Sequence, residues 1–142
     1  MSQPPQPLST RTASILHGAL VVSALAIIGL VWVFRGGVPI ALVPKARVIL
    51  SYVAYGDAGV LLALTAAIRR RVSLLERDPD PEAWWRVNGP KILLLWILGE
   101  AGCVLGAVFW LLTDSQLVLL ALAGVGLLVL AVHRPSKLLE TN

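Results

Sequence analysis

The sequence predicts an all-α, polytopic membrane protein with four transmembrane helices and both termini on the cytoplasmic side. Of its 142 residues, 57% are hydrophobic and 14% are charged, and the mean hydropathy is +0.80. A soluble domain would average about 45–50% apolar and about 25% charged residues. The apolar residues also fall into four long runs separated by short polar stretches, which is the pattern of membrane-spanning helices.

The four apolar runs have lengths close to what a bilayer requires. A helix rises about 1.5 Å per residue, so about 20 residues cross a hydrocarbon core about 30 Å thick. A proline-rich lead over residues 1–10 is expected to be disordered. The spans are expected at about residues 12–34, 45–68, 91–113 and 117–132. They form one membrane domain, because the longest polar stretch is too short to fold separately.

The stretch 69–90 is the longest loop, and we expect it to contain a short interfacial helix. Asp80 is a suitable N-cap and Pro81 suits the first helical position. Asn88-Gly89-Pro90 is expected to end this helix before the third span begins. The residues expected to anchor the loop at the headgroups are Trp84, Trp85, Arg69, Arg70 and Arg71.

The positions of Lys and Arg predict the orientation, because these residues accumulate on the cytoplasmic side. Nine of the twelve lie before the first span, in and around loop 69–90, or after the fourth span. The other three, Arg35, Lys45 and Arg47, flank the first loop. The net charge of +4 therefore serves contact with the lipid bilayer. We expect no nucleic-acid partner, and we expect the protein in the cell inner membrane.

Two carboxylates interrupt the apolar runs, Glu100 in the third and Asp57 in the second. Counting from the cytoplasmic ends places Asp57 roughly 18 Å and Glu100 roughly 14 Å into the membrane. We therefore expect the two acids at similar depths on neighbouring helices. They would act as a polar contact between helices, as a site for a proton or a small cation, or as part of a lipid or substrate site.

Small residues mark where helices can approach closely in lipid. The residues expected to serve helix packing are Gly99, Gly102 and Gly106 of the third span and Gly56 and Gly59 of the second. Such stripes predict a compact bundle or an oligomer, and they do not identify a partner.

The segment 96–113, WILGEAGCVLGAVFWLLT, resembles the carboxylate helix of rotary ATPase proteolipids. In those proteins a Glu followed by Ala, on a helix with a small-residue face, carries the proton. The segment also resembles the third span of ATP synthase accessory protein I, a small four-helix protein. That family typically has a Lys three residues after its Glu, where this chain has Cys103. The resemblance implies a role as a subunit or accessory protein, with Glu100 as the proton-bearing acid on the first analogy.

The sequence contains no phosphate-binding loop, no cluster with metal-ligand spacing and no nucleophile triad. We therefore expect no enzyme activity, no metal and no cofactor. The predicted function is a small non-catalytic subunit, or an accessory or assembly factor, of a larger membrane complex. One alternative is a proton- or cation-coupled transport element that uses Glu100 and Asp57. A second alternative is a self-assembling homo-oligomer.

Overall fold

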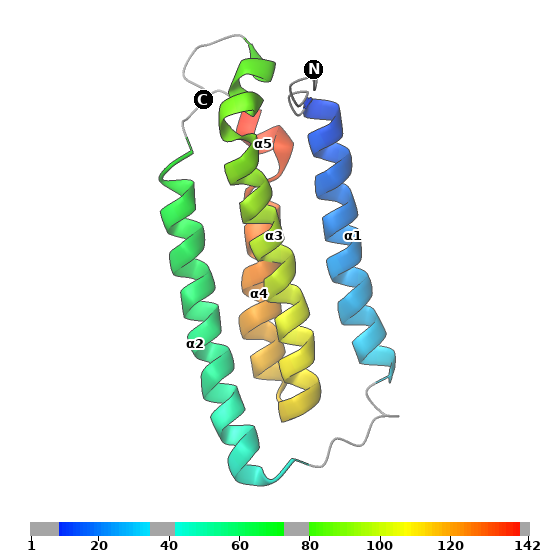
Figure 1. Cartoon of the computed structure of the whole chain (residues 1–142). Helices are drawn as coiled ribbons and strands as arrows, with labels where there is room; N and C mark the ends of the chain where they lie inside the picture. Colours follow the sequence, from blue (N-terminus) through cyan, green and yellow to red (C-terminus); the bar gives the residue numbers. More distant parts are fainter. Residues whose placement is uncertain (1–8, 35–41, 73–79, 140–142) are drawn as a thin grey trace, which may run out of the picture.

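The computed structural model describes residues 9–34, 42–72 and 80–139 (Figure 1). The helices are α1 (Thr10–Phe34), α2 (Pro44–Arg69), α3 (Pro81–Thr113), α4 (Gln116–Val132) and α5 (Pro135–Leu139). No strand occurs in these described ranges. Three of the helices, α1 to α3, are long and apolar enough to cross a membrane, and α4 is a shorter apolar helix. The prediction of an all-helical structure is confirmed for the described residues, and three helices have the length and composition of membrane spans. The fourth span and the orientation of the termini stay predictions.

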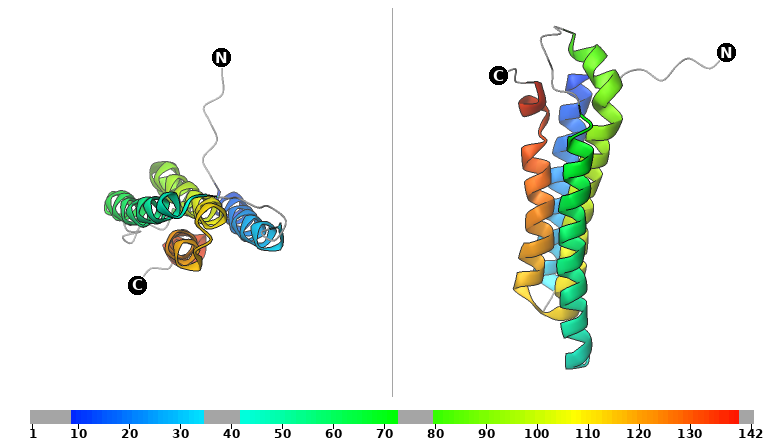
Figure 2. Two further views of the ribbon diagram at one scale, coloured as in Figure 1. Left: turned by 90° about the horizontal axis from the view of Figure 1, so that it is seen from below. Right: turned by 90° about the vertical axis from the view of Figure 1, so that its left-hand side faces the viewer.

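The helices are arranged around α3. Viewed from the end of the bundle, α1 and α2 lie on opposite sides of α3, and α4 lies against a third side (Figure 2). The most extensive contact is between α3 and α4, which the two-residue connection Asp114–Ser115 joins as a tight hairpin. Among the described helices, none lies against the side of α3 opposite α4 (Figure 2).

Both ends of α3 have recognisable caps. Asp80 is the N-cap, and its carboxylate accepts a hydrogen bond of 2.9 Å from the Glu82 N–H. At the other end Asp114 adopts a left-handed conformation with φ of 61°. Its N–H donates to the carbonyl of Trp110 at 2.8 Å, which closes the last turn. The expected N-cap and the expected end at Thr113 both agree with these bounds.

The expected break at Asn88-Gly89-Pro90 is wrong, because the 33-residue helix α3 runs through these residues without interruption. Asn88 and Gly89 are buried and Pro90 is exposed. The buried side of the helix therefore passes without interruption from Trp85 through Asn88 and Gly89 to Ile92. Pro90 supplies no N–H to the preceding turn, but packing on both sides of this position holds the helix together. The expected short interfacial helix is the first part of α3.

Burial is concentrated in α3 and α4. In α1, which is described throughout, the buried residues are Ala13 and Ala24. In α2 they are Ala54, Ala58, Leu61 and Thr65. The largest fully buried side chains include three tryptophans of α3, Trp85, Trp96 and Trp110. The structure thus consists of a packed α3–α4 hairpin with two more peripheral helices.

The expected disordered lead is described only in part. Residues 1–8 lie outside the described residues, whereas Ser9 and Thr10 are described and Thr10 begins α1. The Ser9 hydroxyl accepts a hydrogen bond of 3.2 Å from the Thr12 N–H. This contact serves one of the free N–H groups in the first turn of α1.

Candidate functional site

The two predicted carboxylates lie on different helices, and both are half-buried. Asp57 is in the middle of α2, and Glu100 is in the middle of α3. Within the described part of the chain, neither carboxylate forms a hydrogen bond or an ion pair with another residue. Their relative placement follows from the contacts that neighbouring residues make.

The contact between α2 and α3 shows which way Glu100 faces. A Cβ added to Gly102 would lie 2.6 Å from Cδ2 of Leu61, so this side of α3 faces α2. Glu100 precedes Gly102 by two residues, which is about 200° of rotation at 3.6 residues per turn. Glu100 therefore faces away from α2. It lies about 40° beyond Trp96, whose ring packs edge-to-face on His17 of α1 at 5.1 Å between centroids.

The same contact shows that the two acids differ in depth. The helices α2 and α3 run in opposite directions (Figure 1), and Leu61 lies level with Gly102. Asp57, four residues before Leu61, is therefore level with about Gly106 of α3. From Gly106 to Glu100 is six residues, or about 9 Å along the axis. The expectation of two acids that share a depth and a contact is corrected: the structure does not bring Asp57 and Glu100 together.

Asp57 lies at the edge of α2 that is turned away from α4. Ala54 and Ala58 pack with Val118 and Leu122 of α4, so this side of α2 faces α4. Asp57 is about 100° around the helix from Ala58 and about 40° beyond Leu61, the residue that contacts α3. Glu100 is likewise turned away from α4, because it lies about 100° around α3 from Gly99, which faces α4. Both acids therefore open toward the side of the bundle that α4 leaves free.

Three of the predicted packing glycines lie in the α3–α4 contact. A Cβ added to Gly99 would lie 2.8 Å from Leu130 Cγ, and one added to Gly106 would lie 2.7 Å from the backbone nitrogen of Ala123. Gly102 also faces the Cα atom of Gly126, at 3.1 Å from the added atom. These glycines let two backbones touch, which is a main source of helix association in lipid.

The other two predicted packing glycines do not face another described helix closely. A Cβ added to Gly56 or Gly59 of α2 would have no atom within 4 Å. The predicted packing glycines do not include Gly126 of α4, which lies in the same α3–α4 contact. An added Cβ there would collide with the Gly99 carbonyl and would lie 2.8 Å from the Cys103 nitrogen. Its position in a run of small residues, Ala123, Gly124 and Gly126, is the sequence signal that could have found it.

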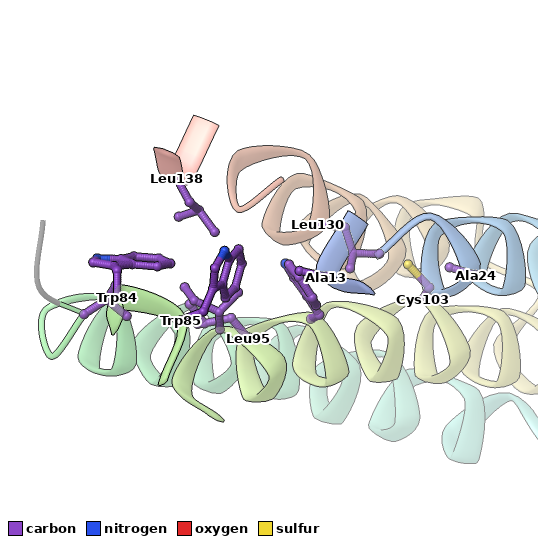
Figure 3. Packing of buried hydrophobic residues seen from close by; sticks show 11 residues of the cluster. Ala13, Ala24, Trp84, Trp85, Leu95, Cys103, Leu130 and Leu138 are labelled. Atoms are coloured by element: carbon purple, nitrogen blue, oxygen red, sulfur yellow. The ribbon is translucent and has the colours of Figure 1, made fainter. Parts of the chain in front are cut away.

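The two tryptophans predicted to anchor the loop at the headgroups are buried within the bundle. Trp84 is 8% exposed and Trp85 is 1% exposed, and the Trp85 indole donates a hydrogen bond of 3.1 Å to the Thr10 hydroxyl. In Figure 3, Leu138 of α5 points toward both indole rings. The physical reason is the continuity of α3, which places both positions in line with the buried residues Asn88 and Ile92.

The predicted arginine anchors lie at the same end of the molecule. Arg69 is half-buried, and Arg70 and Arg71 are exposed. The Arg71 carbonyl accepts a hydrogen bond of 2.9 Å from the Lys91 ammonium group, which connects the end of α2 to α3. Contact of these arginines with headgroups stays a prediction.

Sequence reasoning did not find a polar network that ties the helices together near this end. The Trp96 indole donates to the His133 carbonyl at 2.8 Å, and His17 Nε2 donates to the Leu130 carbonyl at 2.9 Å. These bonds join α3 and α1 to the end of α4. The available signal is a tryptophan well inside an apolar run, since its N–H then needs a partner.

His133 directly follows α4 and is 4% exposed. Its Nδ1 donates to the Val129 carbonyl at 2.8 Å, while Nε2 is buried without a hydrogen-bond partner. Burial lowers the pKa of His133 below its ordinary value of 6.5; the bond to Val129 opposes this, and the charge of Arg69 adds to it. The imidazole is therefore neutral at neutral pH.

Comparisons of the chain with models of protein families, with curated proteins and with solved structures find no match. Among the described residues, no group of three or more His, Cys, Asp or Glu side chains could hold a metal ion. The described bundle thus contains two separated carboxylates and a polar network near the end of α4.

Proposed function

We propose that the chain is a small, non-catalytic integral membrane subunit, or an accessory or assembly factor, of a larger complex in the cell inner membrane. On this proposal α1 to α4 all cross the bilayer, and both termini are cytoplasmic. The 17 residues of α4 span about 26 Å, close to the hydrocarbon thickness of about 30 Å. The alignment of α4 with α3 in the hairpin supports a crossing by both helices (Figure 1).

The observation that carries the proposal is that neither intramembrane carboxylate forms a hydrogen bond or an ion pair with another described residue. A charged side chain at the bilayer centre costs about 2.5–3.5 kcal/mol on insertion scales. Asp57 and Glu100 are half-buried at the edges of a bundle whose spans 48–68 and 92–113 contain no Lys or Arg. A neighbouring protein that supplies hydrogen bonds or charge to these acids would offset the cost. A subunit or accessory factor has such a neighbour.

The transport alternative requires the two acids to serve one path. Glu100 lies on the α1 side of α3, whereas the contact of Leu61 with Gly102 puts Asp57 on the α2 side. The body of α3 separates them, and they differ in depth by about 9 Å. This separation favours the accessory role over proton or cation transfer between the two acids.

The homo-oligomer alternative has one observation in its favour. Gly56 and Gly59 of α2 have open space around them, and Gly59 is followed at four-residue intervals by Ala63 and Ala67. Small residues at this spacing suit a close helix–helix contact in lipid. The same surface would equally suit a different subunit, so it does not favour self-association over the accessory role.

The proposal is tested by purifying the tagged chain from its native membranes in a mild detergent. We expect one or more larger membrane proteins to co-purify in a fixed ratio that survives a second purification step. The control is a second small membrane protein of similar length carrying the same tag. The transport alternative would be supported instead if the chain purified alone and conducted protons in liposomes. Glu100→Gln would then have to abolish this conduction.

A further inference from the structure

We propose that the α4-free face of the bundle binds a transmembrane helix of a different protein that carries a basic side chain within the membrane. The α4-free face is the surface of α3 opposite α4, with Glu100 at its α1 edge and Asp57 at its α2 edge. The inference rests on the proposed function, because it names the surface and the chemistry by which the chain joins its complex.

The centre of the α4-free face consists of exposed apolar side chains of α3. Ile97 is 48% exposed and Val108 is 45% exposed. Their neighbours on the same side are Leu94 at 45% and Leu105 at 41%. On the opposite side of α3, where α4 packs, residues such as Leu95 and Cys103 are completely buried. The α4-free face is therefore a helix surface of ordinary size for packing a further helix.

The bundle already shows that a helix fits alongside α3 between its two flanking helices. On one side α4 lies against α3 with α1 and α2 to either side (Figure 2). On the α4-free face the same two helices flank α3 again. A partner helix there would be bordered by Glu100 on the α1 side and by Asp57 on the α2 side.

The charge of this face selects the chemistry of the partner. Two carboxylates border it, and the described spans contain no basic residue at their depth. Lipid tails offer no hydrogen bonds, so acids at this position are unfavourable next to lipid. A Lys, Arg or His of a neighbouring helix would pair with Glu100 or Asp57 and remove this penalty. The opposite charge makes a basic helix the complementary occupant.

A second copy of the chain is a poor occupant of the same face. A two-fold dimer brings the same surface of each copy against the other. It would place the apolar surfaces together but would bring four carboxylates to one interface without a basic residue. A hetero-partner therefore fits the α4-free face better than self-association does.

The test uses the full chain in its native membrane, with a photo-crosslinking amino acid at single positions. Ile97 and Leu105 probe the α4-free face. Leu120 of α4 and Val60 of α2 are controls on other faces of the bundle, where they are 66% and 57% exposed. We expect crosslinks from Ile97 and Leu105 to one other protein, at least tenfold more abundant than from the controls. The crosslinked peptide should carry a Lys, Arg or His within an apolar segment.

The charge is tested separately by Glu100→Lys and Asp57→Lys. Each is expected to lower recovery of the crosslinked partner at least tenfold, whereas Glu82→Lys, outside the predicted span, leaves it within twofold. If the lysine variants fail to fold, Glu100→Gln and Asp57→Asn still reveal whether the charge is needed, because they keep the size of the side chain. Unchanged recovery with the double variant Glu100→Gln/Asp57→Asn would overturn the role of the acids.

The remaining outcomes also decide between the hypotheses. Crosslinked dimers of this chain from Ile97 and Leu105, or crosslinks to lipid alone, would overturn the inference. A co-purifying protein that crosslinks only from Leu120 or Val60 would overturn the α4-free face but retain the proposed function. A chain with no co-purifying protein at all would overturn the proposed function as well.

Discussion

Glycines recur at intervals of three and four residues in α3 and at an interval of three residues in α2, but the two sets have opposite surroundings. Gly102 and Gly106 face the backbone of α4 so closely that an added Cβ would overlap it, whereas Gly56 and Gly59 face open space. This difference shows that a pattern of small residues indicates where another helix can approach closely. It does not show whether the approaching helix belongs to the same chain. For Gly102 and Gly106 the approaching helix is α4, which follows α3 after a tight turn; for Gly56 and Gly59 the described part of the chain supplies no such helix.

Leucine substitutions provide the sharpest test of this comparison. Gly126→Leu is expected to lower the free energy of unfolding by about 3 kcal/mol, because the new side chain would overlap the Gly99 carbonyl and the Cys103 backbone. Gly59→Leu, on the open face of α2, should change it by less than about 0.5 kcal/mol. Reversible unfolding in mixed micelles measures both. Equal losses in the two variants would show that the α2 glycines are packed too.

A pair of tryptophans sharpens the contrast between buried and exposed surfaces. Trp96 is fully buried and donates to the His133 carbonyl, whereas Trp32 of α1 is 59% exposed. Trp96→Phe should cost about 2 kcal/mol, because a carbonyl loses its donor and the smaller ring leaves space. Trp32→Phe should cost less than half as much. A loss for Trp32→Phe as large as that for Trp96→Phe would contradict the placement of α1 at the edge.

The pH dependence of stability tests the buried network near the end of α4. Burial lowers the pKa of His133, so the unfolded chain binds this proton at a higher pH than the folded chain. Stability should therefore be constant above the ordinary pKa of 6.5 and should fall as the pH drops below it. Thermal midpoints in detergent between pH 8 and pH 5, chosen as about one to two units either side of that pKa, measure the effect. His133→Gln should flatten the curve, and an unchanged slope would assign it to other groups.

The smallest expected effect concerns the two intramembrane acids. Since Asp57 and Glu100 lie on opposite flanks of α3, Asp57→Asn and Glu100→Gln should act independently on unfolding. Their coupling energy in a double-mutant cycle is expected to stay below about 0.5 kcal/mol. A coupling well above that value would mean that the two carboxylates meet after all.

The sequence predicts the elements of this molecule better than their rotation about one another. The apolar runs locate the helices, and Asp80 and the turn at Asp114 locate both ends of α3. The predicted pairing of Asp57 with Glu100 rests only on the depth of each residue in the membrane, which is counted from the ends of the apolar runs. Depth says nothing about which side of a helix a residue faces. The placement of Leu61 against Gly102 is a tertiary contact that apolar composition cannot specify.

The sequence does not predict the continuation of α3 through Pro90 for a related reason. The local pattern Asn88-Gly89-Pro90 favours a helix end, and a single sequence gives no measure of the packing that opposes this preference. The break that this local pattern predicts places Trp84 and Trp85 on a separate interfacial helix. Once α3 is continuous, its periodicity turns both rings toward α1 and α5.

Because α3 is uninterrupted, a small tilt of this helix would produce a larger displacement at its ends. Its 33 residues extend about 50 Å, well beyond a hydrocarbon core of about 30 Å. Trp84 lies 18 residues before Gly102, or about 27 Å along the axis. A tilt of about 5° around the Gly102–Gly126 contact would therefore move the Trp84 end by about 2 Å at this helix geometry. Such a movement would reach the start of α1, because the Trp85 indole donates a hydrogen bond to the Thr10 hydroxyl.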